Sequence, residues 1–309
     1  MSAFSRLWRR APLWRWSLYG SVGFLGLAAL YPTPFMLRHA PWLAHVPGTT
    51  APASPSSGGS PPSSDAQQSG AAQQPGNSPD RVAAPSMNAS FVGSVPFNGH
   101  TLPLPAGTWH PVLTGQVGPG GVQLFNILAR TDRGVVTGVI IARTTTRPLP
   151  ADATAGLDDT CHDDRNFAAR VMSDGQNGVR ECWSVAESTG SANELITTAF
   201  QRLHTFGFPV SPLYVTAVWL RATTTKDGST DVNAVDTLLA PVRPGSTELI
   251  APLAVWTKTE LPNAPLAQNF VRGTTKWMTN WVGVLREGMT HGLSSGTVPD
   301  ELARDPAAP

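Results

Sequence analysis

The chain has 309 residues, a formal net charge of +1 and only 14% charged residues, so its length allows one or two domains. The charge is uneven: residues 1–46 hold five of the 22 basic residues and no acidic one, which leaves 17 basic against 21 acidic residues beyond them. This mildly acidic main part argues against nucleic acid as a partner, because binding to phosphates needs a basic face.

The N-terminal region predicts a membrane anchor. Residues 16–37 carry no charge and would span about 33 Å as a helix, enough for a hydrocarbon core of about 30 Å. The four arginines of residues 1–15 indicate a cytoplasmic basic tail, and Trp16 and Trp42 suit the two membrane interfaces. We therefore expect a single-pass protein of the bacterial inner membrane, with its N-terminus in the cytoplasm and its C-terminal part in the periplasm.

A cleaved signal peptide is the alternative. Gly26, Leu27 and Ala28 place small residues at the spacing of a cleavage site. The apolar run continues beyond them, which favours an uncleaved transmembrane helix or signal anchor over residues 16–37.

The remainder divides by composition into three parts. Residues 38–88 are rich in Pro, Ser, Gly and Gln and predict a disordered linker, because such a segment cannot bury enough apolar surface to offset its ordering entropy. Residues 89–292 predict one α+β domain in the periplasm. Residues 293–309 predict a disordered tail.

Alternating and β-branched runs predict the strands of this domain. The first three form an antiparallel meander whose second turn has Gly134 at a left-handed position. Residues 148–178 are expected to be irregular. The predicted strands are residues 109–117, 122–130, 135–145, 179–187, 213–224, 232–242 and 248–257.

Two helices complete the prediction. Ser191 and Glu194 have the spacing of a capping box for a helix that ends near Gly207. Residues 265–287 show an apolar stripe at helical spacing, and Gly288 is expected to end that helix. The fold class is therefore α+β: a mainly antiparallel sheet of six to eight strands, with both helices expected on one face.

Cys161 and Cys182 are the two cysteines of the chain. In an exported domain a disulfide forms and persists, so we expect these two residues to be joined. The pair is expected to be structural, because a redox-active pair usually has the spacing C-x-x-C.

The acidic segment 158–165 holds the candidate catalytic residues. His162 with Asp163 or Asp164 is the local set that could supply an acid and a base. Its four aspartates and one histidine also suit a cation, but their spacing fits no calcium loop and one histidine is too few for a typical zinc site. We therefore predict a solvated acidic loop with Arg165 as a partner, and neither a metal nor a cofactor.

Two further patterns are set aside. Residues 292–296 match G-x-S-x-G, but a helix precedes Ser294 where the nucleophile elbow needs a strand. The tryptophans of the domain could stack on a sugar or a peptide, but in a domain of this size they are expected in the core.

Several features together resemble a family of uncharacterised exported proteins of Gram-negative bacteria. They are the N-terminal anchor, the run Leu104-Pro105-Ala106-Gly107-Thr108-Trp109, the pair of Cys161 with Cys182-Trp183, and the Trp-rich C-terminal helix. The resemblance covers about residues 95–290. It implies export and a disulfide, and it implies no activity.

The sequence thus favours a non-enzymatic, membrane-tethered periplasmic module that binds or assembles an envelope component, with another envelope protein as a candidate partner. The first alternative is an envelope hydrolase acting on peptidoglycan, polysaccharide or lipid-linked material through His162 and Asp163 or Asp164. The second is a periplasmic sensor domain.

Overall fold

The computed structural model describes residues 80–309 except 119–120, 151–153, 155, 191–193 and 294–297. The expected membrane span at residues 16–37, most of the expected linker, and Ser191 of the capping box lie outside the described residues. Among the described helices, none is both long and apolar enough to cross a membrane.

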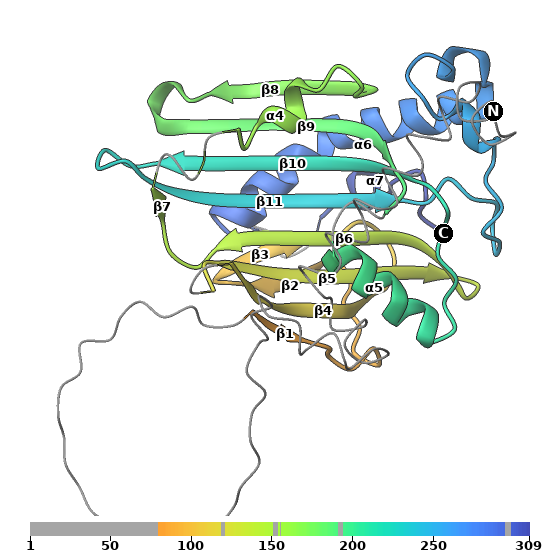
Figure 1. Cartoon of the computed structure of the whole chain (residues 1–309), viewed down its shortest axis with the longest axis horizontal. Coiled ribbons are helices and arrows are strands. Elements are labelled where there is room, and N and C mark those ends of the chain that lie inside the picture. Colours follow the sequence, from red (N-terminus) through yellow and green to blue (C-terminus); the bar gives the residue numbers. More distant parts are fainter. Residues whose placement is uncertain (1–79, 119–120, 151–153, 155, 191–193, 294–297) are drawn as a thin grey trace, which may run out of the picture. The chain divides into compact units, whose positions relative to one another are not determined.

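An antiparallel sheet of nine strands forms the centre of the domain (Figure 1). Its main path has the order β1-β4-β5-β6-β11-β10-β9-β8, and β7 pairs with β11. The strands are β1 (Arg81–Ala83), β4 (Trp109–Val117), β5 (Gln123–Asp132), β6 (Val135–Thr145), β7 (Leu149–Pro150), β8 (Ala168–Asp174), β9 (Val179–Ser188), β10 (Tyr214–Thr224) and β11 (Ser229–Leu239). A separate hairpin consists of β2 (Ser94–Phe97) and β3 (His100–Pro103).

The predicted meander is confirmed as β4, β5 and β6. Arg133 and Gly134 join β5 to β6 with φ values of 48° and 81°. This left-handed two-residue connection matches the right-handed twist of the strands it joins. The local sequence therefore determines this part of the sheet.

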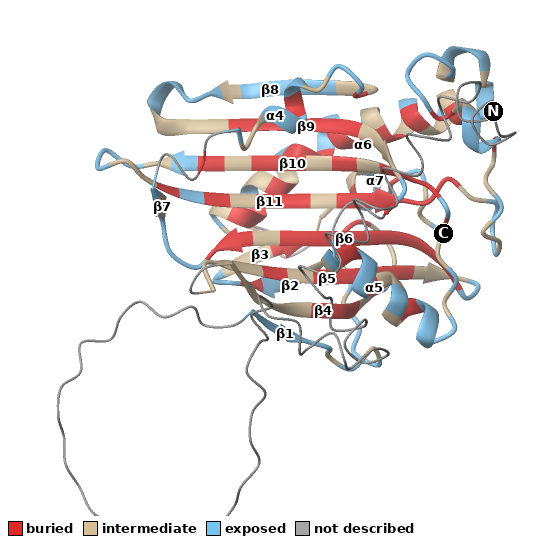
Figure 2. Ribbon diagram, viewed as in Figure 1, coloured by how far each residue is buried: buried red, intermediate tan, exposed pale blue. Residues whose placement is uncertain are grey.

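The helices α6 (Pro265–Thr290) and α5 (Glu194–Thr205) lie on opposite faces of the sheet (Figure 1). Ile140 belongs to the core beneath α6, and its neighbour Ile141 belongs to the core beneath α5. The prediction that both helices cover one face is wrong. The central strand β6 is buried on both sides (Figure 2), so each of its faces needs a cover.

The larger core lies beneath α6 and contains the tryptophans, as predicted. Gly288 does not end this helix. A Cβ atom there would lie 2.4 Å from the carbonyl oxygen of Thr101, so glycine allows α6 to pack closely on β3. The buried tryptophans are Trp109, Trp183, Trp219, Trp256, Trp277 and Trp281.

The domain extends further at both ends than predicted. Residues 81–83 form β1 against β4, although they belong to the expected linker. The expected disordered tail contains α7 (Asp300–Ala303), and Asp305 beyond it is buried and paired with Arg130. That expectation is therefore wrong for residues 298–309, where a buried ion pair fixes the chain.

Two further strand predictions are wrong. Residues 168–174 form the edge strand β8, although the segment 148–178 was expected to be irregular. Residues 248–257 form no strand beyond a single bridge between Val242 and Leu249, and they continue into a short 3₁₀ helix, η4 (Leu253–Val255). Val171 and Met172 in β8 are half-exposed, so this edge strand has too little apolar burial to produce a clear alternating pattern.

Candidate functional site

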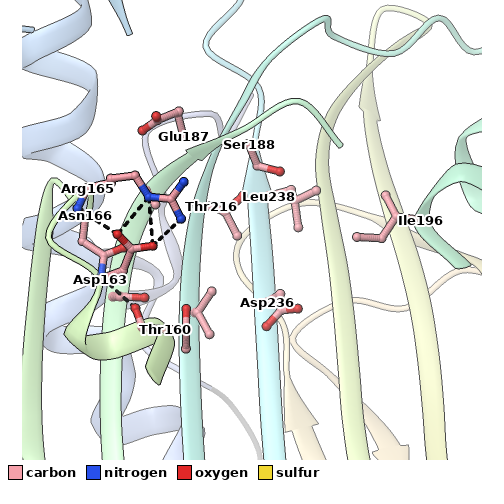
Figure 3. Close-up of a pocket in the computed structure, with 13 residues that line it drawn as sticks. Thr160, Asp163, Arg165, Asn166, Glu187, Ser188, Ile196, Thr216, Asp236 and Leu238 are labelled. Carbon is pink, nitrogen blue, oxygen red and sulfur yellow. Dashed lines mark hydrogen bonds and ion pairs between the residues drawn. The ribbon is translucent and has the colours of Figure 1, made fainter. Parts of the chain in front are cut away.

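A groove of about 420 Å³ opens on the α5 side of the sheet, above β9, β10 and β11 (Figure 3). Ile196 of α5 lines one side of the groove. The other side is lined by Thr160 of α4 (Asp159–His162) and by Asp163, Arg165 and Asn166 in the loop that follows. The groove thus lies between two elements that cover the same sheet face.

Strand register brings the groove floor together. Ser184 of β9 is paired with Val218 of β10, which is paired with Asp236 of β11. Thr216, two residues before Val218, lies on the same face because side chains alternate along a strand. Three strands that are far apart in sequence therefore contribute polar side chains to one surface.

A second cavity of about 360 Å³ continues the groove. It shares Thr160, Val218 and Asp236 with the first cavity and extends to Gln123 and Arg143. The combined groove therefore crosses the strands obliquely, from β9 towards β6 and β5.

The floor carries an ion pair whose hydrogen bonds are incomplete. The Nη2 atom of Arg143 donates to Oδ2 of Asp236 at 2.6 Å, with the two side chains 32% and 16% exposed. The Nε atom of Arg143 and Oδ1 of Asp236 are buried and have no hydrogen-bond partner among the described residues. The pair therefore keeps one donor and one acceptor for another molecule.

Two hydroxyl groups of the floor also lack a hydrogen-bond partner among the described residues. Ser184 is 1% exposed, and its Oγ atom has no partner within the described chain. The Oγ1 atom of Thr216 is also buried and unpartnered there. Each buried polar group without a partner costs about 1–3 kcal/mol, and such groups are rare in folded proteins. Four of the ten such atoms in the described chain belong to this groove, which makes it the candidate binding site.

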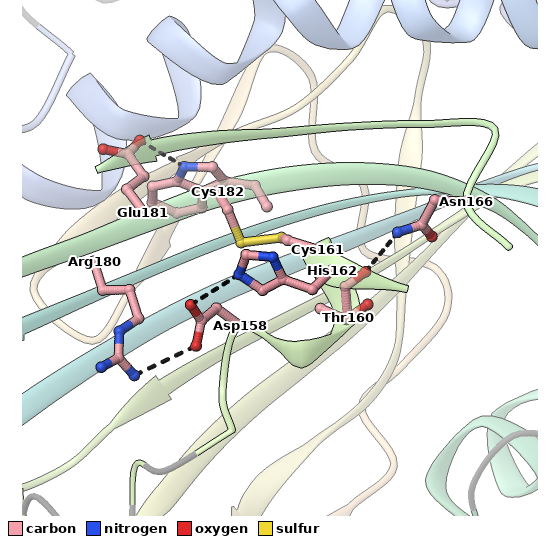
Figure 4. The surroundings of a disulfide bond; sticks show 9 residues. Asp158, Thr160, Cys161, His162, Asn166, Arg180, Glu181 and Cys182 are labelled. Carbon is pink, nitrogen blue, oxygen red and sulfur yellow. Dashed lines mark hydrogen bonds and ion pairs between the residues drawn. A yellow bond between two sulfur atoms is a disulfide. The ribbon is translucent and has the colours of Figure 1, made fainter. Parts of the chain in front are cut away.

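A disulfide holds the α4 wall of the groove (Figure 4). The predicted pairing of Cys161 with Cys182 is confirmed, and it attaches α4 to β9. The amide of Asn166 donates to the carbonyl oxygen of Thr160 at 2.7 Å, and Lys258 donates to that of Asp164 at 2.7 Å. The disulfide therefore fixes the wall on the sheet, and the two hydrogen bonds hold its own shape and attach it to the segment around Lys258.

Replacing both Cys161 and Cys182 by alanine is expected to lower the free energy of unfolding by roughly 3 kcal/mol, because the unfolded chain loses a cross-link 21 residues apart in sequence. Urea unfolding of the full chain measures the change. Wild-type protein treated with a reductant is the control and should lose a similar amount. An unchanged urea midpoint in both samples would contradict a stabilising role.

The candidate catalytic residues of the acidic segment 158–165 do not contact one another as predicted; His162 and Asp163 have different partners. His162 is 59% exposed, and its Nε2 atom lies 3.4 Å from Oδ2 of Asp158 rather than pairing with Asp163 or Asp164. Asp163 accepts three hydrogen bonds from the guanidinium of Arg165, at 2.6, 3.0 and 3.1 Å. These side-chain hydrogen bonds lower the pKa of Asp163 to about 2.

A carboxyl group with such a pKa remains ionised at neutral pH and is a weak base. The described residues contain no group of three or more His, Cys, Asp or Glu side chains that could hold a metal ion. His162 and Asp163 thus pair with Asp158 and Arg165 and not with each other, although Asp163 contributes to the wall of the groove.

Sequence reasoning missed Arg143, Ser184, Thr216 and Asp236. A weak signal for two of them exists. Arg143 is the single charged residue of β6, and Asp236 follows the apolar pair Ala234-Val235 in β11. Buried charges are uncommon and usually paired, so each could have been marked as a residue with a special role.

Comparison with known protein families, with curated proteins and with solved structures finds no match to this chain.

Proposed function

We propose that this protein is a membrane-tethered periplasmic module that binds a component of the cell envelope in the groove above β9, β10 and β11. The observation that carries the proposal is the set of buried, unpartnered polar atoms on Ser184, Thr216, Asp236 and Arg143. A bound molecule that supplies hydrogen bonds to them would remove their desolvation cost. The groove volumes of about 420 and 360 Å³ suit a molecule of modest size.

The sequence and the disulfide support the location. The charge-free residues 16–37 and the preceding arginines are typical of an anchor with a cytoplasmic N-terminus. A disulfide between Cys161 and Cys182 persists in an oxidising compartment such as the periplasm.

Binding fits the groove better than hydrolysis does. Neither cavity is lined by a histidine among the described residues, so the hydroxyls of Ser184 and Thr216 lack the usual base that activates a nucleophile. The carboxylate of Asp236 is already paired with Arg143. These groups are arranged to form hydrogen bonds with a ligand.

We expect Thr216→Phe to fill the groove and to reduce the recovery of the bound component by about tenfold or more, a loss of at least about 1.4 kcal/mol. Tagged full-length protein is cross-linked in cells, purified in mild detergent, and compared with wild type by mass spectrometry. Thr223→Phe is the matched control, because Thr223 is exposed in the same strand but points to the opposite sheet face.

Two results would contradict the proposal. The first is full recovery of the bound component with Thr216→Phe, in a variant that circular dichroism shows to be folded. The second is recovery of no stoichiometric component with wild-type protein. Loss of cellular function in His162→Ala but not in Thr216→Phe would instead favour the hydrolase.

A further inference from the structure

The groove has the form of a channel for an extended chain. Along β10, every second residue from Thr216 to Leu220 lines one or both of its cavities. At about 3.3 Å per residue, this part of the strand alone spans roughly 13 Å, about four residues of an extended peptide. The first cavity also reaches Ser188 and the second reaches Gln123, so the groove continues at both ends.

The floor suits small side chains and backbone amides. Ala186, Val218 and Leu238 provide small or aliphatic surface beside the hydroxyls of Ser184 and Thr216. A hydroxyl group both donates and accepts, which matches the alternating N–H and C=O groups of a peptide backbone. The described lining residues include no aromatic ring, so the groove offers no flat platform for a sugar ring.

Asp236 offers an acidic acceptor to a ligand in the groove. On the groove face, the acidic residues Asp163 and Asp236 are matched by the basic residues Arg143 and Arg165. Glu187 also borders the first cavity, but its side chain alternates to the other sheet face, as does that of its strand partner Val215. Arg165 binds Asp163, and Arg143 occupies one oxygen of Asp236. Oδ1 of Asp236 and Nε of Arg143 remain buried without a partner in the described chain.

An ionised carboxylate oxygen accepts hydrogen bonds but cannot donate them, so the ligand has to donate to Oδ1 of Asp236. A primary ammonium group brings three donors and the opposite charge, and a charge-assisted hydrogen bond is about twice as strong as a neutral one. Resting on the proposed function, we infer that the groove takes an extended peptide segment of an envelope protein and places a lysine ammonium of that segment against Oδ1 of Asp236.

The experiment uses full-length protein in mild detergent and fluorescent hexapeptide libraries. Each library is acetylated and amidated at its ends, carries one fixed residue at a central position, and is randomised elsewhere. We expect the lysine library to bind at least about tenfold more tightly than the norleucine or glutamate library, as measured by fluorescence anisotropy. Thr216→Phe should abolish this binding.

Asp236→Asn should remove the preference for lysine, because an amide lacks the charge while keeping an acceptor for Arg143. Glu260→Gln is the matched control: it also removes one negative charge, but from an exposed residue that does not line the groove. It should leave the preference unchanged.

Equal binding of the three libraries, no binding of any, or a lysine preference that survives in Asp236→Asn would overturn the inference. Chito-oligosaccharides are tested in parallel, so that failure of the peptide inference can be distinguished from failure of the proposed binding function. Saccharide binding that Thr216→Phe abolishes would overturn the peptide inference and keep the groove as a binding site. If no peptide or saccharide binding depends on Thr216, and Thr216→Phe retains the cellular component, both proposals fail.

Discussion

Asp305→Ala is expected to lower the free energy of unfolding by about 3–5 kcal/mol, because it leaves the guanidinium of Arg130 buried without its counter-charge. The side chains of Arg130 and Asp305 are 1% and 0% exposed. They form a two-pronged ion pair, with Nη1 to Oδ2 at 2.6 Å and Nη2 to Oδ1 at 2.9 Å. The pair joins β5 to the C-terminal segment across 175 residues.

The surroundings of Arg130 explain why the effect should be large. Its Nη1 atom also donates to the carbonyl oxygen of Ala106 at 2.7 Å, and its guanidinium carbon lies 4.9 Å from the centre of the Trp109 ring. These contacts hold the guanidinium in place after Asp305 is removed, so it cannot swing out to water. An unpaired buried charge is then the main cost.

Urea unfolding of the full chain, followed by tryptophan fluorescence, measures this change. Asp300→Ala is the matched control, because Asp300 is an exposed acid in the first turn of α7. It should change stability by no more than about 0.5 kcal/mol. A loss below 1 kcal/mol in Asp305→Ala would show that the tail contributes little to the fold.

The same ion pair shows a limit of the sequence analysis. Residues 293–309 contain little that predicts order locally, since alanine, proline, glycine and serine dominate them. Their placement depends on Arg130 of β5, which is distant in sequence. No local pattern encodes such a contact, whereas the β4–β5–β6 meander needed only alternation and one turn.

The groove was missed for a related reason. Period-two patterns predicted β10 and β11 and thus which residues share a face, but they did not indicate what covers each face. That depends on α5 and α6 lying on opposite sides of the sheet. The acidic segment 158–165 attracted attention because its charges are adjacent in sequence, yet His162, Asp163 and Arg165 are occupied within the segment itself.

Glu181→Ala is expected to reduce stability by about 2–3 kcal/mol, because it leaves the buried indole N–H of Trp219 without an acceptor and removes the counter-charge of two partly exposed guanidinium groups. Glu181 is 2% exposed on β9. It accepts hydrogen bonds from Nε1 of Trp219 at 2.9 Å, from Nη1 of Arg221 at 2.7 Å, and from Nε of Arg286 at 2.9 Å. These partners belong to β10 and to α6, so one side chain attaches the helix to two strands.

Glu181→Gln separates the charge from the shape, since glutamine keeps the size and one acceptor but leaves two guanidinium groups without a counter-charge. We expect Glu181→Gln to lower the free energy of unfolding by most of the amount that Glu181→Ala does. The double variant Glu181→Gln with Arg286→Gln should recover part of that loss. Urea unfolding measures all three. Glu248→Gln serves as the control: Glu248 and Arg243 are 66% and 61% exposed, and an exposed pair contributes at most about 1 kcal/mol. Equal losses in Glu181→Gln and Glu248→Gln would mean that packing, and not the buried charge, holds α6 on the sheet.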